Sequence, residues 1–346
     1  MLEKQHEPIA FELAQSVKTH NHKILYLCNS DKEARLIKNE LKLFLDDTEI
    51  GYYPEREILP YDRFSTADSI IQKRIKLLNS DKSNINLIIT SCINLFEKLP
   101  SKKFFVARKS FKTNDLLTIK DLTTSLDSLN YERTDKVNAI NQYAVRGGVV
   151  DFYSGFHLNP VRVDFFGDQI DEIREFDPLT QNMTNKISEF QLFSGSEVSL
   201  DDESIGKFKK AWRNYFQNHD ERYCEIFQCL ALGKYPEGYE IYNPLIQLGD
   251  SNLMDYFSGF KLIKSHQIDQ ILTSHQAFVE ERYLEESIDS SRPILKPEDY
   301  IFEIEDLQAY LKSADQLSFS DSNLAIDHSK EKDIQLKELI EKQVNG

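Results

Sequence analysis

The stretch Gln142–Asp177 places the tightest constraint on the fold, because its apolar residues alternate with polar residues in four short runs. Such alternation is typical of half-buried strands, and the pairs Gly147-Gly148 and Gly167-Asp168 are turn or bulge signals between runs. The pattern therefore predicts four consecutive strands that turns join into an antiparallel sheet. The apolar content comes from Tyr143, Val145, the run Val149–Phe152, Val161, Val163 and Phe165.

Arginines and an extra phenylalanine lie where this sheet should meet water. Arg146 and Arg162 fall inside the predicted strands, and Phe166 follows Phe165 at the end of one of them. Because side chains alternate across a strand, Arg162 and Phe166 are predicted to share the outward face, opposite Phe165. A cation and a large apolar ring are thus placed together on an exposed surface.

Two interpretations of that outward face remain open from the residues alone. In the first, Arg146, Arg162 and Arg174 pair with the seven acids of residues 142–177, each pair contributing only about 0.2–1 kcal/mol. In the second, the face binds a partner, because arginine and aromatic residues are enriched at interface hot spots and lysine is depleted. The pattern alone favours ion pairing, although the absence of lysine from the four strands agrees with binding.

The first part of the chain alternates compact apolar strands with helices, which is typical of a parallel α/β sheet. Ser30-x-x-Glu33 matches a capping box that would open the first of these helices. We expect this first domain to cover about residues 1–112. Its strand candidates are 23–28, 50–53 and 86–90, and its helix candidates run from Ser30 through Phe44, over 67–78 and over 93–99.

Two further segments follow. After a strand at 104–109, a helix capped by Thr118 and the strands 131–137, 142–177 and 186–193 predict a small α+β module at about 113–195. Helices then return from residue 200 onward. The candidates there are a helix opened by Asp201-Asp202-Glu203, helices at 223–232 and 267–287, and a strand at 260–265.

The end of the chain is predicted to be a polar linker at 317–328 followed by a helix at 331–344. The apolar stripe of that last helix has nothing after it to pack on. We therefore expect the chain to be cut from a longer protein.

Bulk properties narrow the function classes. The 346 residues carry a formal net charge of −15, so the whole molecule is a poor candidate for wrapping nucleic-acid phosphates, although a local basic patch is compatible with it. No secretory signal and no run of about 18 apolar residues is present, which predicts a soluble cytoplasmic protein. The four cysteines are scattered and are expected to be buried free thiols rather than metal ligands: Cys28, Cys92, Cys224 and Cys229.

Motifs for catalysis, cofactors and metals are absent from the sequence. A phosphate-binding loop requires G-x4-G-K-[ST], and both Gly206-Lys207 and Gly233-Lys234 fail that pattern. The acidic run 201–203 is interpreted as a solvated helix start rather than a magnesium site. Neither G-x-S-x-G nor H-E-x-x-H occurs. No catalytic residue, cofactor site or metal site is therefore predicted.

A family resemblance adds to these inferences. The succession EREILPYDRFS, NLIITSCINLFEKLP, QYAVRGGVVDFYS and VRVDFFGDQIDEIREFDPLT resembles the N-terminal UvrB-homology region of the bacterial transcription-repair coupling factors (Mfd), over about residues 20–325. The later segment GYEIYNPL is similar to the same family. UvrB itself has a phosphate-binding loop near its N-terminus and a long tyrosine-rich hairpin, whereas here Tyr52-Tyr53-Pro54 passes almost directly into EILPYD.

The resemblance implies an architecture and a binding site. The fold would be a degenerate helicase-like parallel α/β domain built from residues 1–112 and 196–325, with the α+β domain 113–195 inserted and a linker and the start of a next domain at 326–346. The inserted domain would bind UvrA. The contact residues carried over by the motifs are Arg146, Arg162 and Phe166, with Arg174 in the same region. Asn141-Gln142 stands where the family commonly has Gly-Glu.

The resemblance also implies a function. The chain would be an adaptor that recruits UvrA to stalled RNA polymerase in transcription-coupled nucleotide excision repair. The intact family protein is an ATP-dependent DNA translocase that binds RNA polymerase and double-stranded DNA, but this fragment would lack ATPase and helicase activity. The alternative is a nucleotide- or DNA-binding helicase-like fragment related to UvrB, against which the missing phosphate loop and the net acidity count.

Overall fold

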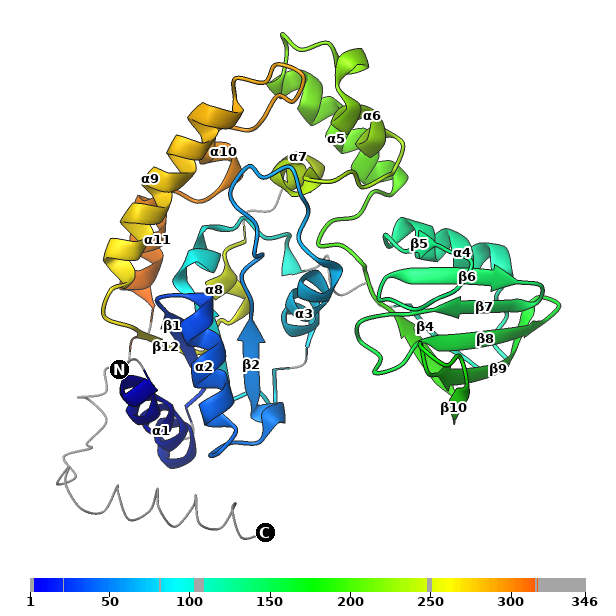
Figure 1. Cartoon of the computed structure of the whole chain (residues 1–346), viewed down its shortest axis with the longest axis horizontal. Coiled ribbons are helices and arrows are strands. Elements are labelled where there is room, and N and C mark those ends of the chain that lie inside the picture. The colour runs from blue at the N-terminus through cyan, green and yellow to red at the C-terminus, as the bar shows by residue number, and fades with distance from the viewer. Residues whose placement is uncertain are drawn as a thin grey trace.

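The parallel sheet predicted for the first domain gains a fourth strand from far along the chain. Strands β1 (Ile24–Cys28), β2 (Ile50–Tyr53) and β3 (Leu87–Ser91) are joined by β12 (Lys261–Lys264) in the order β12-β1-β3-β2. All three pairings are parallel. Segments on both sides of the inserted sheet therefore share one α/β layer, as a helicase-like domain with an insertion requires (Figure 1).

This computed structural model describes residues 3–20, 22–80, 82–102, 109–247, 251–314 and 316. The strand predicted before residue 109, the polar linker at 317–328 and the helix at 331–344 lie outside the described residues. Within the described part of the chain, no helix is long and apolar enough to cross a membrane. All four cysteines are free thiols, three of them buried and Cys229 half-buried.

Helices cover both faces of the parallel sheet. Because strand side chains alternate, Tyr26 packs on the side of α1 (Glu3–His20) and α2 (Asp31–Leu41), while Leu27 joins the core on the side of α3 (Asp68–Asn79). The predicted start of α2 is confirmed, since the Ser30 hydroxyl accepts a hydrogen bond from the backbone N–H of Glu33. No sequence pattern above predicts α1, which adds a layer to the first face.

A large helical layer completes the core on the α3 side and extends away from the sheet (Figure 1). Buried Trp212 of the first of these helices contacts the rings of Phe216, Phe227 and Tyr242. The helices are α5 (Asp202–Tyr215), α6 (Glu225–Ala231), α7 (Asn243–Ile246), α8 (Leu253–Tyr256), α9 (Ile268–Glu286), α10 (Pro297–Tyr300) and α11 (Ile304–Ser313).

Three helix predictions are wrong in length. The helix predicted from Ser30 through Phe44 ends at Leu41. The segment predicted as a helix over 93–99 is a 3-10 helix at Cys92–Phe96, because the following residues extend to form single bridges, Glu97 with Ile301 and Leu99 with Ser251. The helix predicted over 223–232 is split. Cys224 has extended backbone angles and separates a 3-10 turn from α6.

The four strands predicted within 142–177 are confirmed. They are β6 (Gln142–Arg146), β7 (Val149–Phe152), β8 (Val161–Phe166) and β9 (Gln169–Phe176), and each pairs with the next in antiparallel register. Gly147 and Gly167 have φ values of 61° and 63°, a left-handed backbone that tight hairpin turns need and that glycine adopts at little cost.

The edges of this sheet differ from the prediction. The strand expected over 131–137 is only β5 (Glu132–Arg133), and it pairs in parallel with β6. The strand expected over 186–193 is broken at Ser188, whose carbonyl accepts the Thr113 N–H at 3.1 Å. Its first half, β10 (Met183–Ile187), pairs with β9, while its second half, β11 (Glu189–Leu192), pairs with β4 (Lys109–Lys112) in a separate two-stranded sheet.

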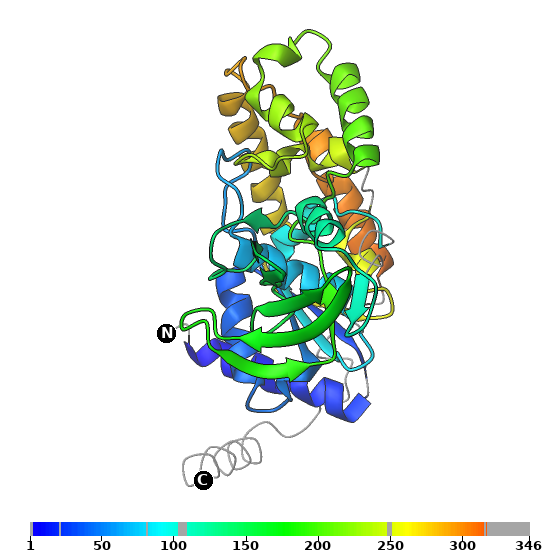
Figure 2. The ribbon, with the colours of Figure 1, turned by 90° about the vertical axis from the view of Figure 1, so that its right-hand side faces the viewer.

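The six-stranded sheet lies beside the parallel-sheet domain, and Figure 2 shows it in front of that domain with the helical layer above. Gln72 of α3 joins the two parts, because its Nε2 donates to the Asn141 Oδ1 and to the Ser194 carbonyl, both at 3.0 Å. Asn141 has φ 64° and donates from Nδ2 to the Gly195 carbonyl. The left-handed backbone explains why asparagine can stand where the family commonly has glycine.

Candidate protein-interaction face

One face of the six-stranded sheet packs in the main core of the domain, and the other carries exposed side chains together with a small buried cluster of Val137, Ala144 and Phe176. Helix α4 (Ile119–Ser128) and the β4–β11 pair pack against the inner face, where Val150, Val163 and Ile173 are buried. Alternation puts Arg146, Arg162 and Phe166 on the opposite side, which we call the outer face. The register shift between β8 and β9 adds its extra residue to β9, so the alternation along β8 is unbroken.

A buried carboxylate organises the outer face. The side chain of Asp151 is 1% exposed and accepts hydrogen bonds from Arg162 Nε at 2.6 Å and Arg162 Nη2 at 2.7 Å. Arg146 Nη2 reaches the same carboxylate from the neighbouring strand. The Arg162 guanidinium also lies over the Phe176 ring, 4.9 Å from its centroid. Two cations on one anion leave the group with a net positive charge.

These contacts hold Arg162 in a single orientation. Its bonds to Asp151 raise the pKa of the Arg162 guanidinium, which is charged at every pH at which proteins fold. Two of its five N–H groups are used by Asp151, and its side chain is 17% exposed. Because removing one member of a buried ion pair leaves an uncompensated charge, Asp151 and Arg162 depend on each other.

Arg174 belongs to a second, more exposed set of ion pairs on the same face. It binds Asp164 at 2.6 Å and Glu172 at 3.3 Å, and Lys186 binds Glu172 at 2.8 Å. The hydrogen bond from Lys186 lowers the pKa of the Glu172 carboxyl. The structure thus confirms that all three arginines form ion pairs within the chain. Their side chains differ in how far they are exposed to solvent.

Exposure separates the predicted residues. Phe166 is 81% exposed at the β8–β9 turn, and the Arg146 side chain is 52% exposed. Phe165, by contrast, packs against the inner core. The predicted facing of Arg162 and Phe166 is confirmed, and Phe166 and Arg146 are the most exposed of the four predicted residues.

Asp151 is the residue that the sequence patterns miss. It stands in the middle of the apolar run Val149–Phe152, where burying a carboxylate is costly unless a cation pairs with it. That misfit, together with arginines on the neighbouring strands, is the signal that could have identified it.

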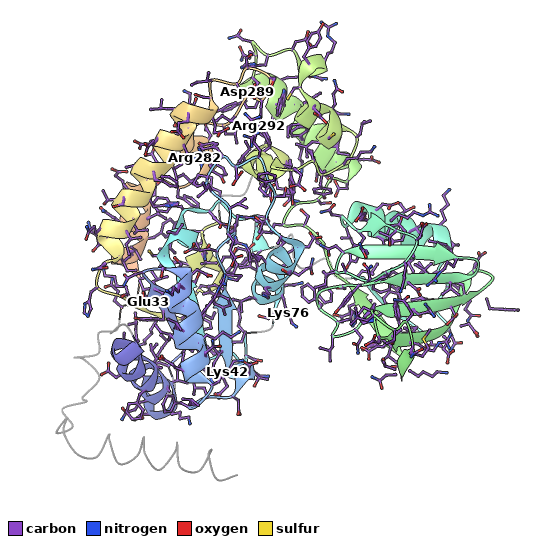
Figure 3. The ribbon with its side chains drawn as sticks, viewed as in Figure 1. Glu33, Lys42, Lys76, Arg282, Asp289 and Arg292 are labelled. Atoms are coloured by element: carbon purple, nitrogen blue, oxygen red, sulfur yellow. The ribbon has the colours of Figure 1, made fainter. Side chains whose placement is uncertain are left out.

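Acidic side chains lie at the carboxyl end of the parallel sheet. In a nucleotide-binding protein, free backbone N–H groups at this edge would bind the phosphates. Only Asn29 and Ser30 separate β1 from α2, and Ser30 caps the helix. The buried Asp31 carboxylate accepts bonds from the Tyr52 hydroxyl at 2.6 Å and the Glu55 N–H at 3.1 Å. Glu33 lies beside it at the start of α2 (Figure 3). Arg35 Nε also binds the Asp31 carboxylate at 2.7 Å, so hydrogen bonds and ion pairs within the chain occupy this edge.

A cavity of about 350 Å³ lies at the carboxyl ends of β2 and β3. One of its walls is a buried ion network, in which Arg56 binds Glu97 and Glu197, and Arg74 Nε binds Glu197 at 2.9 Å. Burial alone would raise the pKa of Glu197, but Arg56 and Arg74 lower it to about 2. The cations are neutralised inside the protein, so the network ties the loop after β2 to α3 and to the segment that follows the inserted domain.

Among the residues that the structure describes, no group of three or more His, Cys, Asp or Glu side chains could hold a metal ion.

Comparison with known proteins places the six-stranded sheet within a known domain family. Residues 110–197, which contain the whole six-stranded sheet, match the UvrB interaction domain family. The chain is 26% identical over 308 residues to the transcription-repair-coupling factor of Haemophilus influenzae, covering 88% of this chain and 27% of the relative. Identity to that of Rickettsia conorii is 31% over 243 residues, 68% of this chain and 21% of the relative.

The Escherichia coli transcription-repair-coupling factor gives a similar match, 26% identity over 308 residues, 87% of this chain and 26% of the relative. The chain thus spans about a quarter of the length of these curated relatives. Residues 110–197 match the UvrB interaction domain family, and most of the chain is homologous to the transcription-repair-coupling factors, consistent with their N-terminal region.

Proposed function

We propose that this chain is the UvrA-recruiting part of a transcription-repair coupling factor and that the outer face of the six-stranded sheet is its docking surface. The observation that carries the proposal is the exposed Phe166 ring beside the half-exposed Arg146 guanidinium, on a domain of the UvrB interaction family. Exposure of an aromatic ring to water is unfavourable, so its burial against a partner favours binding.

The chemistry of the face indicates the kind of partner surface it fits. Phe166 would enter an apolar pocket, and Arg146 would meet a carboxylate at the rim of that pocket. Asp151 already orients Arg146, so less conformational entropy is lost when the partner binds. The fixed guanidinium is the feature that a lysine on a flexible stem would not supply.

Arg162 and Arg174 take supporting parts in the proposal. Arg162 holds Asp151 and retains N–H groups that can donate to the partner. Arg174 is partly exposed and paired with two acids, so a partner carboxylate would compete with Asp164 and Glu172 for it. We therefore assign it the weaker contribution.

The adaptor role has no need of nucleotide chemistry in this part of the protein. Capping of α2 by Ser30 and the buried Asp31 at the same edge support the proposal that the fragment itself neither binds nor hydrolyses ATP. Translocation on double-stranded DNA and contact with RNA polymerase would then belong to the rest of the coupling factor. The alternative, a fragment that binds nucleotide, is disfavoured by the capped start of α2 at the edge of the parallel sheet.

Analytical size-exclusion chromatography of the chain mixed with purified UvrA tests the proposal. We expect the two proteins to co-elute. Separate elution of chain and UvrA at micromolar concentrations would overturn the proposed function.

A further inference from the structure

A second exposed apolar residue lies on the outer face at the same end as Phe166. Leu116 is 86% exposed, although it stands in a well-defined segment between β4 and α4. Its neighbour Leu117 is buried in the inner core. Leu117 therefore contributes to the core, whereas Leu116 is exposed to solvent.

Backbone hydrogen bonds place Leu116 beside the β8–β9 turn. The Leu117 N–H donates to the Asp168 carbonyl at 2.9 Å, and the Ile170 N–H donates to the Asp115 carbonyl at 3.0 Å. These two bonds flank an antiparallel bridge between Leu116 and Gln169. Opposed residues of such a bridge send their side chains to the same face and lie close together, because the pair is of the non-hydrogen-bonded kind.

Gln169 connects Leu116 to Phe166. It is opposite Leu116 on one side and opposite Phe166 on the other, since Phe166 and Gln169 are paired across the β8–β9 ladder. Leu116, Gln169 and Phe166 therefore form one row across the outer face. The inward neighbours Leu117, Ile170 and Phe165 all contact the inner core, as the alternation requires.

The segment that carries Leu116 is held in place. The Gln169 side-chain amide donates to the Asn114 carbonyl at 2.8 Å, and the Asp115 carboxylate accepts the Lys112 N–H at 2.7 Å. Presenting Leu116 to a partner thus costs little ordering entropy. A leucine on a mobile loop would lose conformational entropy on binding.

A lone exposed leucine is common on protein surfaces, and Leu158 and Leu179 are examples on this domain. Leu116 differs because it continues a surface that already contains Phe166 and a cation. The Phe165 N–H donates to the Gly148 carbonyl at 2.8 Å, which sets the β6–β7 turn next to the end of β8. Arg146, just before that turn, therefore lies at the same end of the face.

From this row we infer that Leu116 and Phe166 together form a two-residue apolar anchor that enters a cleft on UvrA, with Arg146 at its rim. The inference rests on the proposed function and specifies it: the partner surface is an apolar cleft wide enough for two side chains and bordered by a carboxylate. Leu116 is then a binding residue, although it contributes almost nothing to the core of the chain.

Isothermal titration of purified UvrA with the full chain tests the anchor. Leu116→Ala should weaken binding about ten-fold or more, whereas Leu116→Met, which keeps an apolar side chain, should stay within about three-fold of the parent. Leu179→Ala is the matched control, because Leu179 is equally exposed but belongs to the β9–β10 turn at the opposite end of the sheet. It should leave the affinity unchanged.

Phe166→Ala separates failure of the anchor from failure of the proposed function. If Phe166→Ala weakens binding while Leu116→Ala behaves like Leu179→Ala, the anchor is overturned and the docking face stands. If the parent chain does not bind UvrA, the anchor and the proposed function are both overturned. In the double variant Leu116→Ala/Phe166→Ala, a fold-loss of affinity that differs from the product of the two single fold-losses supports a shared cleft, and a fold-loss equal to that product overturns it. Equal melting temperatures establish that the variants are folded.

Discussion

The buried carboxylate of Asp151 binds the guanidinium of Arg162 through both Nε and Nη2, on the solvent side of a sheet. Arg146 joins the same carboxylate, so one acid holds two of the residues proposed to meet UvrA. Ion pairing within the chain and binding to a partner are therefore compatible. The first fixes the arginine geometry, and the second would use it.

Asp151→Asn should destabilise the six-stranded sheet. Two arginines would lose their anion, one of them largely buried, and breaking such a pair costs about 3 kcal/mol or more. Hydrogen exchange of the β7 and β8 amides measures the local free energy of opening directly. Asp171→Asn, an exposed acid of β9, is the control and should change it little. An Asp151→Asn loss below about 1 kcal/mol would show that the pair is not structural.

Arg146→Ala should weaken UvrA binding with little loss of stability, because its side chain is half exposed and Asp151 keeps both bonds to Arg162. We expect an affinity loss of about 1–2 kcal/mol that shrinks as salt is raised, since the contact is electrostatic. Titrations at two ionic strengths measure it. Lys136→Ala, at an exposed lysine of the same domain, should have no effect at either.

Acid should remove the contribution of the Glu197 network in a defined pH window. Burial and the two arginines together hold the pKa of Glu197 at about 2, below its ordinary value of 4.5. A carboxyl with a lowered folded-state pKa stabilises the fold above the unfolded pKa, and this is lost as pH falls toward 2.

The stability difference between the parent and Glu197→Gln should therefore be largest above about pH 5 and shrink toward pH 2. Urea unfolding of both proteins across this range measures the difference. Other groups, such as His275, titrate in both proteins and cancel. A difference that stays constant with pH would contradict the assignment.

Asn141 offers a test of the junction between the two sheets. Its backbone is left-handed, with φ 64°, and its side chain bonds Gln72 and the Gly195 carbonyl. Asn141→Gly loses only the bonds, whereas Asn141→Ala loses the bonds and strains the backbone. We expect alanine to cost about 1 kcal/mol more than glycine in thermal unfolding. The reverse order would mean that the backbone at this position relaxes.

Nucleotide should leave the fragment's melting temperature unchanged. Any ligand that binds the folded state alone raises it, so millimolar Mg-ATP should give a clear shift if a site of micromolar affinity exists. We predict a shift within error, because Ser30 and Asp31 occupy the edge where phosphates would bind. A shift of several degrees would favour the nucleotide-binding alternative.

The local patterns of the sequence predict much of this fold. Alternation and the two glycine turns are sufficient to predict β6 to β9, because hairpins depend on residues close in sequence. Pairing of β12 with β1 could not be predicted, since nothing in either strand specifies a partner more than two hundred residues away. The break at Ser188 depends likewise on a hydrogen bond to Thr113, which only the folded chain reveals.

The candidate site divides in the same way. The facing of Arg162 and Phe166 follows from alternation along one strand, and the structure confirms it. The sharing of Asp151 by two strands and the row from Leu116 to Phe166 depend on register, which periodicity does not determine.

Titration of UvrA with the chain and its Phe166→Ala variant tests the central claim most directly. Phe166 is almost fully exposed, so truncation should not disturb folding, and the loss of affinity reports the contact alone. We predict a loss of about 2 kcal/mol or more, roughly a 30-fold rise in Kd, with Leu179→Ala unchanged. Equal affinity of the folded Phe166→Ala variant and the parent chain would contradict the assignment of the outer face as the docking surface.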